Sequence, residues 1–320
     1  MKDVLRIADL SPDDLRHGIG LALAAKRRPR EWGSLLDGET AVLCFAMPAT
    51  RSRILFESAV ARLGGTPVVL GPTELQLGRD DSLEDAAKDI SRFARAIVIR
   101  GFDDKDLRRF AAAATAPVIN ASSAGHHPCQ ALTDLMTLRE HFGRLSGLKV
   151  AYLGAGNNVA HSLIEACALA GIDIAVATPP GFGPSVEVLD HADQVARVSG
   201  SIVWPTHDPL VAVAGANAVY TGPWSSMNTS EQERELRVAA LRPYEVTSAV
   251  MAEADPGAVF LHCLRTRRGE EVSPAVIDGP QALVVEQAEN RLHAAVGLLA
   301  GLLKEELAGA TAGSREPQPA

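Results

Sequence analysis

The residues best suited to chemistry follow short apolar segments that have the composition of β-strands. After the segment 41–45 comes Met47-Pro-Ala-Thr-Arg-Ser-Arg53, which runs directly into a predicted helix. Backbone N–H groups at a helix N-terminus bind anions, and Thr50, Arg51 and Ser52 would add two hydroxyls and a guanidinium. The pattern predicts an anion site. The alternative is a capped helix that carries two surface arginines.

Two further strand ends in the first half of the chain carry cations or hydrogen-bond donors. Arg100 ends the apolar segment 96–100, and His127 and Gln130 follow the segment 117–119. The carboxyl ends of parallel strands meet at one edge of a sheet, where ligands bind. A single histidine is more typical of a protein core. Three consecutive strand ends with a cation or donor instead predict one shared crevice.

A glycine-containing turn opens the second half. The segment Gly154-Ala-Gly-Asn-Asn158 follows a strand-like run and begins a predicted helix. The third glycine of the dinucleotide fingerprint is replaced by Val159, so the pattern disfavours a nicotinamide cofactor. Asn157 and Asn158 instead offer side-chain amides suited to a carboxylate or amide ligand.

Two later strand ends also carry polar groups. The segment 218–220 leads into Thr221-Gly-Pro-Trp-Ser-Ser-Met227, and the segment 258–262 leads into Cys263. Cys263 stands where a reactive thiol would, and the arginines at 265, 267 and 268 would lower its pKa. The alternative for Cys263 is a buried residue that packs at a strand end.

Strand-like and helical segments alternate along the chain. This predicts an α/β protein built from two doubly wound parallel-sheet domains with bridging helices. We expect one domain over 1–135, against which a helix over 288–307 packs, a second over 136–287, and a disordered tail over 308–320. The expected strands are 41–45, 66–70, 96–100, 117–119, 149–153, 173–177, 218–220, 258–262 and 282–285, and the expected helices include 11–26, 54–63, 83–94, 131–142 and 160–170.

Composition excludes several classes of protein. The 320 residues are 47% hydrophobic and 22% charged, which is typical of a folded globular chain with room for two cores. The net charge of −8 and scattered basic residues disfavour nucleic-acid binding. Apolar runs are too short to span a membrane, and the N-terminal residues lack a signal peptide's apolar stretch, so we expect a cytoplasmic protein. The four cysteines show no close pairs typical of zinc or redox sites.

Taken together, these segments resemble the aspartate/ornithine carbamoyltransferase family over nearly the whole chain. Its phosphate loop is matched by Ala49-Thr-Arg-Ser-Arg53, and its His-Pro-x-Gln motif by His127-Pro-Cys-Gln130. The ornithine branch is matched by Gly156-Asn-Asn-Val-Ala-His-Ser162 and by Cys263, where aspartate enzymes have a proline. Three further segments also match the family: 177–179, 268–272 and 288–293. Six motifs in the same order are far more specific than any one of them.

The resemblance implies a carbamoyltransferase that uses carbamoyl phosphate and an amine, without metal or organic cofactor. Arg100, His127 and Cys263 would be catalytic. Carbamoyl phosphate would be bound by Thr50, Arg51, Ser52, Gln76, Arg100, His127, Gln130, Cys263, Leu264 and Arg291, and the amine by Asn158, Gly222, Ser226 and Met227. The family is built from trimers with active sites at subunit boundaries. We therefore expect a homotrimer in which Gln76 serves a neighbouring subunit.

The sequence departs from the family pattern at four places, and the departure at Gly222 is the most informative. Ala49 replaces a serine of the phosphate loop, Ala46 and Met47 replace a Glu-Lys pair, and Arg265 replaces a proline. Gly222 replaces the aspartate that pairs with the α-amino group of ornithine. A glycine cannot pair with an ammonium group, and a charge buried without its partner costs on the order of 3–5 kcal/mol.

We therefore expect an acceptor other than free L-ornithine. A diaminopropionyl residue or another small or peptide-borne amine of antibiotic biosynthesis would fit. The first alternative is an ordinary ornithine carbamoyltransferase in which another group replaces the aspartate. The second is a catalytically silent binding or regulatory homologue, which the full set of Arg51, Arg100, His127, Gln130 and Arg291 disfavours. A dehydrogenase is the third, and the missing fingerprint disfavours it.

Overall fold

The chain divides into two compact units. The structure, a computed structural model, describes residues 2–74, 82–225 and 229–313, with side chains described as far as residue 303. Unit 1 comprises Met1–Cys129 and Arg291–Ala320, and unit 2 comprises Gln130–Asn290. The expected domain limits at 135 and 287 lie inside helices α5 (Pro128–Phe142) and α12 (Val284–Gly313), which each span a change of unit. Within the described ranges, no helix is long and apolar enough to cross a membrane.

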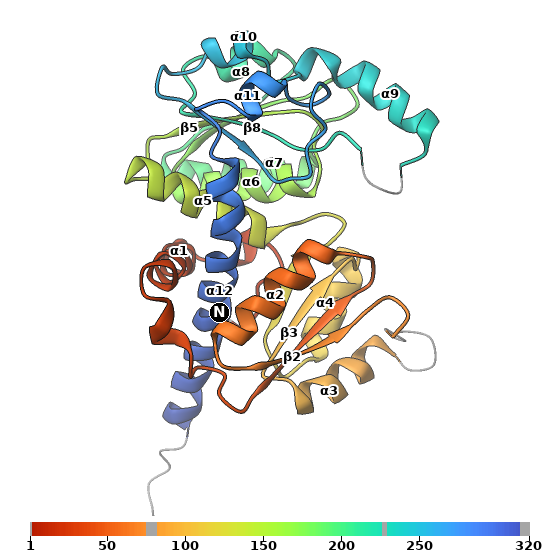
Figure 1. Cartoon of the computed structure of the whole chain (residues 1–320), viewed down its shortest axis with the longest axis vertical. Helices are drawn as coiled ribbons and strands as arrows, with labels where there is room; N and C mark the ends of the chain where they lie inside the picture. Colours follow the sequence, from red (N-terminus) through yellow and green to blue (C-terminus); the bar gives the residue numbers. More distant parts are fainter. Residues whose placement is uncertain (1, 75–81, 226–228, 314–320) are drawn as a thin grey trace, which may run out of the picture. The chain divides into compact units, whose positions relative to one another are not determined.

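Unit 1 is built on a parallel sheet whose described strands run in the order β2-β1-β3-β4 (Figure 1). The strands are β1 (Thr40–Phe45), β2 (Thr66–Leu70), β3 (Ala96–Arg100) and β4 (Val118–Ser122). The chain moves outward in opposite directions from β1 and β3, so the crevice between their carboxyl ends is a topological switch point. Such points are where doubly wound sheets bind ligands.

Helices flank this sheet, and several of them have side-chain N-caps. They are α1 (Pro12–Arg27), α2 (Thr50–Arg62), α3 (Leu83–Phe93) and α4 (Asp104–Ala113), with 3₁₀ turns η1 (Ile7–Asp9) and η2 (Pro29–Trp32). Ser11 and Asp14 form a reciprocal capping box at the start of α1. Gly297 of α12 lies so close to α1 that a Cβ would come within 2.5 Å of the Ala22 nitrogen. Only glycine permits this helix contact inside unit 1.

Unit 2 has a second parallel sheet, and its described strands run in the order β7-β6-β5-β8-β9. The strands are β5 (Lys149–Leu153), β6 (Asp173–Ala177), β7 (Val203–Thr206), β8 (Ala218–Thr221) and β9 (Val259–His262). The switch point lies between β5 and β8. The helices are α6 (Asn158–Ala170), α7 (Val186–Ser199), α8 (Pro209–Val213), α9 (Glu231–Leu241), α10 (Ser248–Ala252) and α11 (Pro274–Ile277), with a 3₁₀ turn η3 (Arg242–Tyr244). The prediction of two doubly wound parallel-sheet domains is confirmed.

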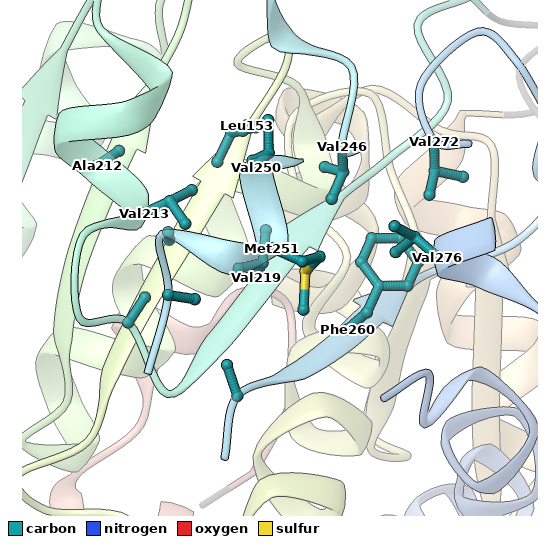
Figure 2. Packing of buried hydrophobic residues seen from close by; sticks show 14 of the residues in the cluster. Leu153, Ala212, Val213, Val219, Val246, Val250, Met251, Phe260, Val272 and Val276 are labelled. Carbon is teal, nitrogen blue, oxygen red and sulfur yellow. The ribbon is translucent and has the colours of Figure 1, made fainter. Parts of the chain in front are cut away.

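Each unit encloses its own apolar core. In unit 1, Ile97, Ile99 and Phe110 belong to a cluster between the sheet and helices α3 and α4. In unit 2, Figure 2 shows Met251 of α10 beside Val219 of β8 and Phe260 of β9. Apolar side chains on the strands thus hold helices against the sheet, and the polar residues beyond the strand ends are left outside these cores.

Two segments differ from the predicted strands. The segment 282–285 is not a strand, because α12 begins at Val284 and only Ala282 forms an isolated bridge, to Phe260. Its apolar residues instead lie just before and at the start of helix α12. The edge strand β7 was not predicted, because Trp204 and Pro205 are exposed and the strand lacks a buried apolar run. Helix α12 also continues to Gly313, into the segment expected to be a tail.

Candidate active site

The first turn of α2 forms one side of the crevice in unit 1. Helix α2 begins at Thr50, directly after the loop that follows β1, and Ala49 at its N-cap provides no side-chain hydrogen bond. The N–H groups of this turn are therefore not capped by that side chain and face the switch point of the sheet. Arg53 donates from Nε to Glu57 Oε1 at 2.8 Å along the helix surface. Of the two arginines, only Arg51 remains a candidate ligand for an anion.

Positive charge gathers in unit 1 around Arg100. Arg100 ends β3 in register with Phe45, the last residue of β1, and donates from Nη1 to the carbonyl oxygen of Ala121 at 3.1 Å. Burial and the electrostatic repulsion of Arg291 lower the pKa of Arg100. Two guanidinium groups whose charges repel each other at a buried site favour the binding of an anion between them.

His127 lies in the same electrostatic environment. Burial, followed by the charges of Arg100 and Arg291, holds the pKa of His127 well below its usual value. His127 is therefore neutral at physiological pH, and a neutral imidazole donates one hydrogen bond without adding a third positive charge. Within unit 1, the charges of Arg100 and Arg291 thus both act on His127.

The loop that carries His127 is fixed by Asp104. One carboxylate oxygen of Asp104 lies 2.9 Å from His126 Nδ1 and accepts from Ser123 Oγ at 2.7 Å, and the other accepts from the Gly125 N–H at 2.8 Å. Burial opposes ionisation, but these bonds, the one from His126 first, lower the pKa of Asp104 to about 2. A charged carboxylate thus holds the backbone that positions His127. No pattern in the sequence indicates this role.

The switch point of unit 2 is lined by neutral groups. Gly222 follows β8, and a Cβ there would lie 3.6 Å from Cys263 Sγ, 3.6 Å from the Tyr152 hydroxyl and 3.9 Å from Asn157 Nδ2. These are ordinary contacts, and the backbone of Gly222 is not in the left-handed region. The fold therefore has room for a Cβ here, and glycine is not required by the backbone.

Tyr152 is part of this pocket and was missed by sequence reasoning. Its hydroxyl donates to the carbonyl oxygen of Ala155 at 2.8 Å. Burial, with Cys263 nearby, raises the pKa of Tyr152, so the phenol remains neutral. Tyr152 lies on β5 in register with Tyr220 of β8, and a tyrosine inside an apolar strand is typical of core packing. Only the pairing of the two strands reveals its position at the switch point.

The turn at Gly156 places two asparagines at the start of α6. A Cβ at Gly156 would come within 2.2 Å of the Pro184 nitrogen, so a glycine is needed where the two loops meet. Asn157 is the N-cap of α6, and its side-chain oxygen accepts from the N–H groups of Val159 and Ala160. Asn157 therefore directs its amide nitrogen toward Gly222.

Cys263 and Leu264 follow β9 directly. Cys263 is buried, 7% exposed, and Leu264 has a left-handed backbone conformation with φ of 48°. Two of the three arginines expected to influence the thiol have carboxylate partners: Arg267 lies 3.7 Å from Glu270, and Arg268 lies 2.6 Å from Asp278. The predicted effect of these arginines on Cys263 therefore has no support in their contacts.

Three predicted site residues lie outside the described residues. These are Gln76, Ser226 and Met227. Gln130 is described, is 3% exposed and belongs to unit 2, where its side chain donates to Asp134. The candidate groups thus form a cationic set in unit 1 and a neutral set in unit 2, each at the carboxyl edge of a parallel sheet.

Two doubly wound units with a cationic crevice in one are suited to an enzyme that binds a small anion, and comparison with known proteins identifies its family. A family model for the carbamoyl-phosphate-binding domain of aspartate/ornithine carbamoyltransferases matches residues 2–140. The model for the Asp/Orn-binding domain of the same family matches residues 146–302. The chain belongs to the aspartate/ornithine carbamoyltransferase family and is a carbamoyltransferase.

Relatives and solved structures resemble the chain over nearly all of its length. An ornithine carbamoyltransferase of Parafrankia sp. (strain EAN1pec) is 49% identical over 288 residues, which are 90% of this chain and 90% of the relative. One from Bacillus subtilis (strain 168) is 42% identical and covers 94% of both chains. The structure of an ornithine carbamoyltransferase from Pyrococcus furiosus has a TM-score of 0.91 at 41% identity, covering 95% of this chain and 97% of that one.

Proposed function

We propose that this carbamoyltransferase transfers the carbamoyl group of carbamoyl phosphate to the side-chain amine of L-ornithine and forms citrulline. The observation that carries the donor side is the grouping of Arg100, Arg291 and a neutral His127 beside the uncapped first turn of α2. For the acceptor, the supporting observation is identity of 49% and 42% to proteins named ornithine carbamoyltransferase. This favours ornithine over the altered acceptor that the sequence motifs alone suggest.

In the proposed donor site, unit 1 holds the phosphate group and polarises the carbamoyl oxygen. Thr50, Arg51 and Ser52 bind the phosphate at the start of α2. Arg100 and His127 donate to the carbamoyl oxygen, which becomes negative when the carbon is attacked. Donors aimed at such an oxygen stabilise the transition state, and losing one typically lowers the rate about 10²–10³-fold. Arg291 adds positive charge.

The chemical step needs only positioning and electrostatics. The uncharged amine of the acceptor attacks the carbamoyl carbon and forms a C–N bond. The bond from that carbon to the phosphate oxygen breaks, and phosphate leaves with the bonding electrons. The leaving phosphate takes the proton that the amine loses. Unit 2 supplies the acceptor groups, with Asn158 and Cys263 near the amine and Gln130 and the Leu264 carbonyl as acceptors for the carbamoyl NH₂.

The test is a product assay with carbamoyl phosphate and a panel of amines. The panel holds L-ornithine, putrescine, 2,3-diaminopropionate and a diaminopropionyl peptide, and both phosphate and the carbamoylated product are measured. Saturable formation of citrulline supports the proposal. Turnover with another amine, but not with ornithine, overturns the choice of acceptor and leaves carbamoyl transfer intact. Binding of carbamoyl phosphate without turnover of any amine supports the silent homologue.

One observation favours a second candidate, a carbamoyltransferase for an amine without a free α-amino group. The surroundings of Gly222 are formed by Tyr152, Asn157 and Cys263, and none of these three side chains is a carboxylate. A diaminopropionyl residue held in a peptide has no ammonium group that needs a carboxylate there. A ratio of kcat/KM that favours the peptide over ornithine supports this candidate, and the reverse ratio contradicts it.

We further propose that the chain assembles as a homotrimer in which Gln76 completes the site of a neighbouring copy. The family resemblance of the phosphate loop and the His-Pro-x-Gln motif supports this assembly. Sedimentation equilibrium would measure the mass in solution, and mixing Gln76→Ala with Arg100→Met subunits would test sharing of sites. Recovery of activity in the mixture supports shared sites, and a stable monomer with full activity contradicts them.

A further inference from the structure

Unit 2 contains a fully buried hydrogen-bond network centred on Asp134. Asp134 lies on α5 and is 0% exposed. Its Oδ1 accepts from Gln130 Nε2 at 2.7 Å and from Gln287 Nε2 at 2.6 Å. Gln287 is likewise 0% exposed, and its Oε1 accepts from the backbone N–H of His262 at 2.9 Å. The network thus joins α5, the first turns of α12 and the end of β9.

The chemistry of the partners fixes each amide in one orientation. A carboxylate can only accept hydrogen bonds, and a backbone N–H can only donate. Gln287 lies between one of each, so exchanging its amide oxygen and nitrogen would break both bonds. Gln130 must likewise turn its Nε2 toward Asp134. Its Oε1 therefore faces the opposite side, where it can accept a hydrogen bond from a ligand.

The second branch reaches the residues that follow β9. His262 is 0% exposed, and its Nδ1 accepts from the Leu264 N–H at 2.8 Å, so the imidazole hydrogen lies on Nε2, toward Glu271 Oε1 at 3.4 Å. Gln287 holds the backbone of His262, and His262 holds the backbone of Leu264. The direction of the Leu264 carbonyl thus depends, through three hydrogen bonds, on the same carboxylate.

We propose that Asp134 is the positioning residue that orients both acceptors of the carbamoyl NH₂ group, the Gln130 amide oxygen and the Leu264 carbonyl. The inference rests on the proposed donor site. Asp134 does not touch the substrate. Its role is to make the protein recognise an NH₂ group rather than another substituent of the same size, because both acceptor oxygens are held without freedom to turn.

The test compares three ligands in the absence of any amine acceptor. Calorimetry would measure binding of carbamoyl phosphate, acetyl phosphate and inorganic phosphate to the full-length protein. Acetyl phosphate has a methyl group in place of NH₂, and inorganic phosphate has neither. For Asp134→Ala, we expect binding of carbamoyl phosphate to weaken about tenfold, the equivalent of one net hydrogen bond. Binding of the other two ligands should change little.

Three further variants separate positioning from loss of stability. Asp134→Asn keeps an accepting oxygen and should recover part of the preference for carbamoyl over acetyl phosphate. Gln287→Leu breaks only the branch to β9 and should lose less preference than Asp134→Ala. Thr137→Val is the matched control: Thr137 is buried on the same helix and bonds to the Thr133 carbonyl and to Asn290 instead. It should lower the melting temperature without changing the preference.

The outcomes distinguish this inference from the proposed function. A wild-type protein that does not bind carbamoyl phosphate overturns the proposed function itself. A wild-type protein that prefers carbamoyl phosphate, with the same preference in Asp134→Ala, overturns only the role of Asp134. Equal weakening of all three ligands in Asp134→Ala also overturns it, because a general structural defect would do the same. Selective loss with carbamoyl phosphate supports it.

Discussion

The two units present opposite electrostatics at equivalent places in similar sheets. At the switch point of unit 1, Arg100 and Arg291 repel each other and His127 is kept neutral. At the switch point of unit 2, the nearest side chains to Gly222 are Tyr152, Asn157 and Cys263, none of which is a basic or a carboxylate side chain. Under the proposed function, the same architecture binds a phosphate in one unit and an amine in the other. The proposed donor site then selects its ligand by charge, whereas the proposed acceptor site selects by shape and hydrogen bonds.

The strongest way to test this contrast is to remove charge from unit 1. Arg100→Met preserves much of the side-chain volume and removes a donor to the developing oxyanion. We expect kcat to fall about 10²–10³-fold in a phosphate-release assay. Arg53→Met is the control, since Arg53 pairs with Glu57 on the helix surface and should leave kcat unchanged. Similar rates for both variants would contradict the assignment of Arg100 to the donor site.

The next test removes the carboxylate that holds the His127 loop. The pKa of Asp104 is lowered to about 2 from 3.8, so its ionised form stabilises the fold above pH 3.8, and that stabilisation is lost as the pH falls through about 2. We expect Asp104→Asn to lower the free energy of unfolding by about 2 kcal/mol at pH 7. Urea titrations from pH 7 to pH 2 would measure the difference, which should shrink toward the acid end. A difference independent of pH would show that the charge is not responsible.

The third test adds a negative charge to unit 2, beside the proposed acceptor site. Gly222→Asp places a carboxylate where a Cβ has ordinary contacts, so we expect the fold to accept it. Its pairing with the α-ammonium of ornithine should raise kcat/KM for ornithine about tenfold, in line with one charge-assisted hydrogen bond. Gly222→Ala, which adds bulk without charge, should show no gain. A lower kcat/KM for ornithine in both variants would mean that any side chain at position 222 obstructs the acceptor.

The smallest expected effect concerns the neutrality of His127. Because its folded-state pKa lies well below 6.5, the unfolded chain takes up a proton near that value while the native chain does not. Stability should therefore decline as the pH falls below about 6.5, at no more than about 1.4 kcal/mol per pH unit. His127→Asn should remove this part of the decline in thermal unfolding measured from pH 7.5 to 5. An unchanged slope would place its origin in other groups.

Sequence patterns predicted most of the fold because local chemistry specifies it. Strands such as Lys149–Leu153 and Asp173–Ala177 are apolar runs that end at polar turns, and their bounds match the prediction. The edge strand Val203–Thr206 escaped prediction because it buries little, and the run at 282–285 misled because apolar residues also precede helices.

The site was predictable only where single residues carry the chemistry. Arg100 and His127 are recognisable as donors after strand ends. The bond between Asp134 and Gln287 joins residues 153 positions apart, and no local pattern indicates it. The surroundings of Gly222 depend on which strands are neighbours in the sheet, so Tyr152 could not be placed beside it from sequence alone.

The four buried cysteines allow local unfolding to be measured in each unit by thiol labelling. Cys44 and Cys129 are buried in unit 1, and Cys167 and Cys263 are buried in unit 2. Burial raises the pKa of Cys44 and Cys129 to about 12, which suppresses the thiolate that reagents attack. Labelling followed by peptide mass spectrometry would therefore measure, for each thiol, the frequency of local unfolding around it. With two cysteines in each unit, the labelling rates would show whether bound phosphate reduces local opening in one unit or in both.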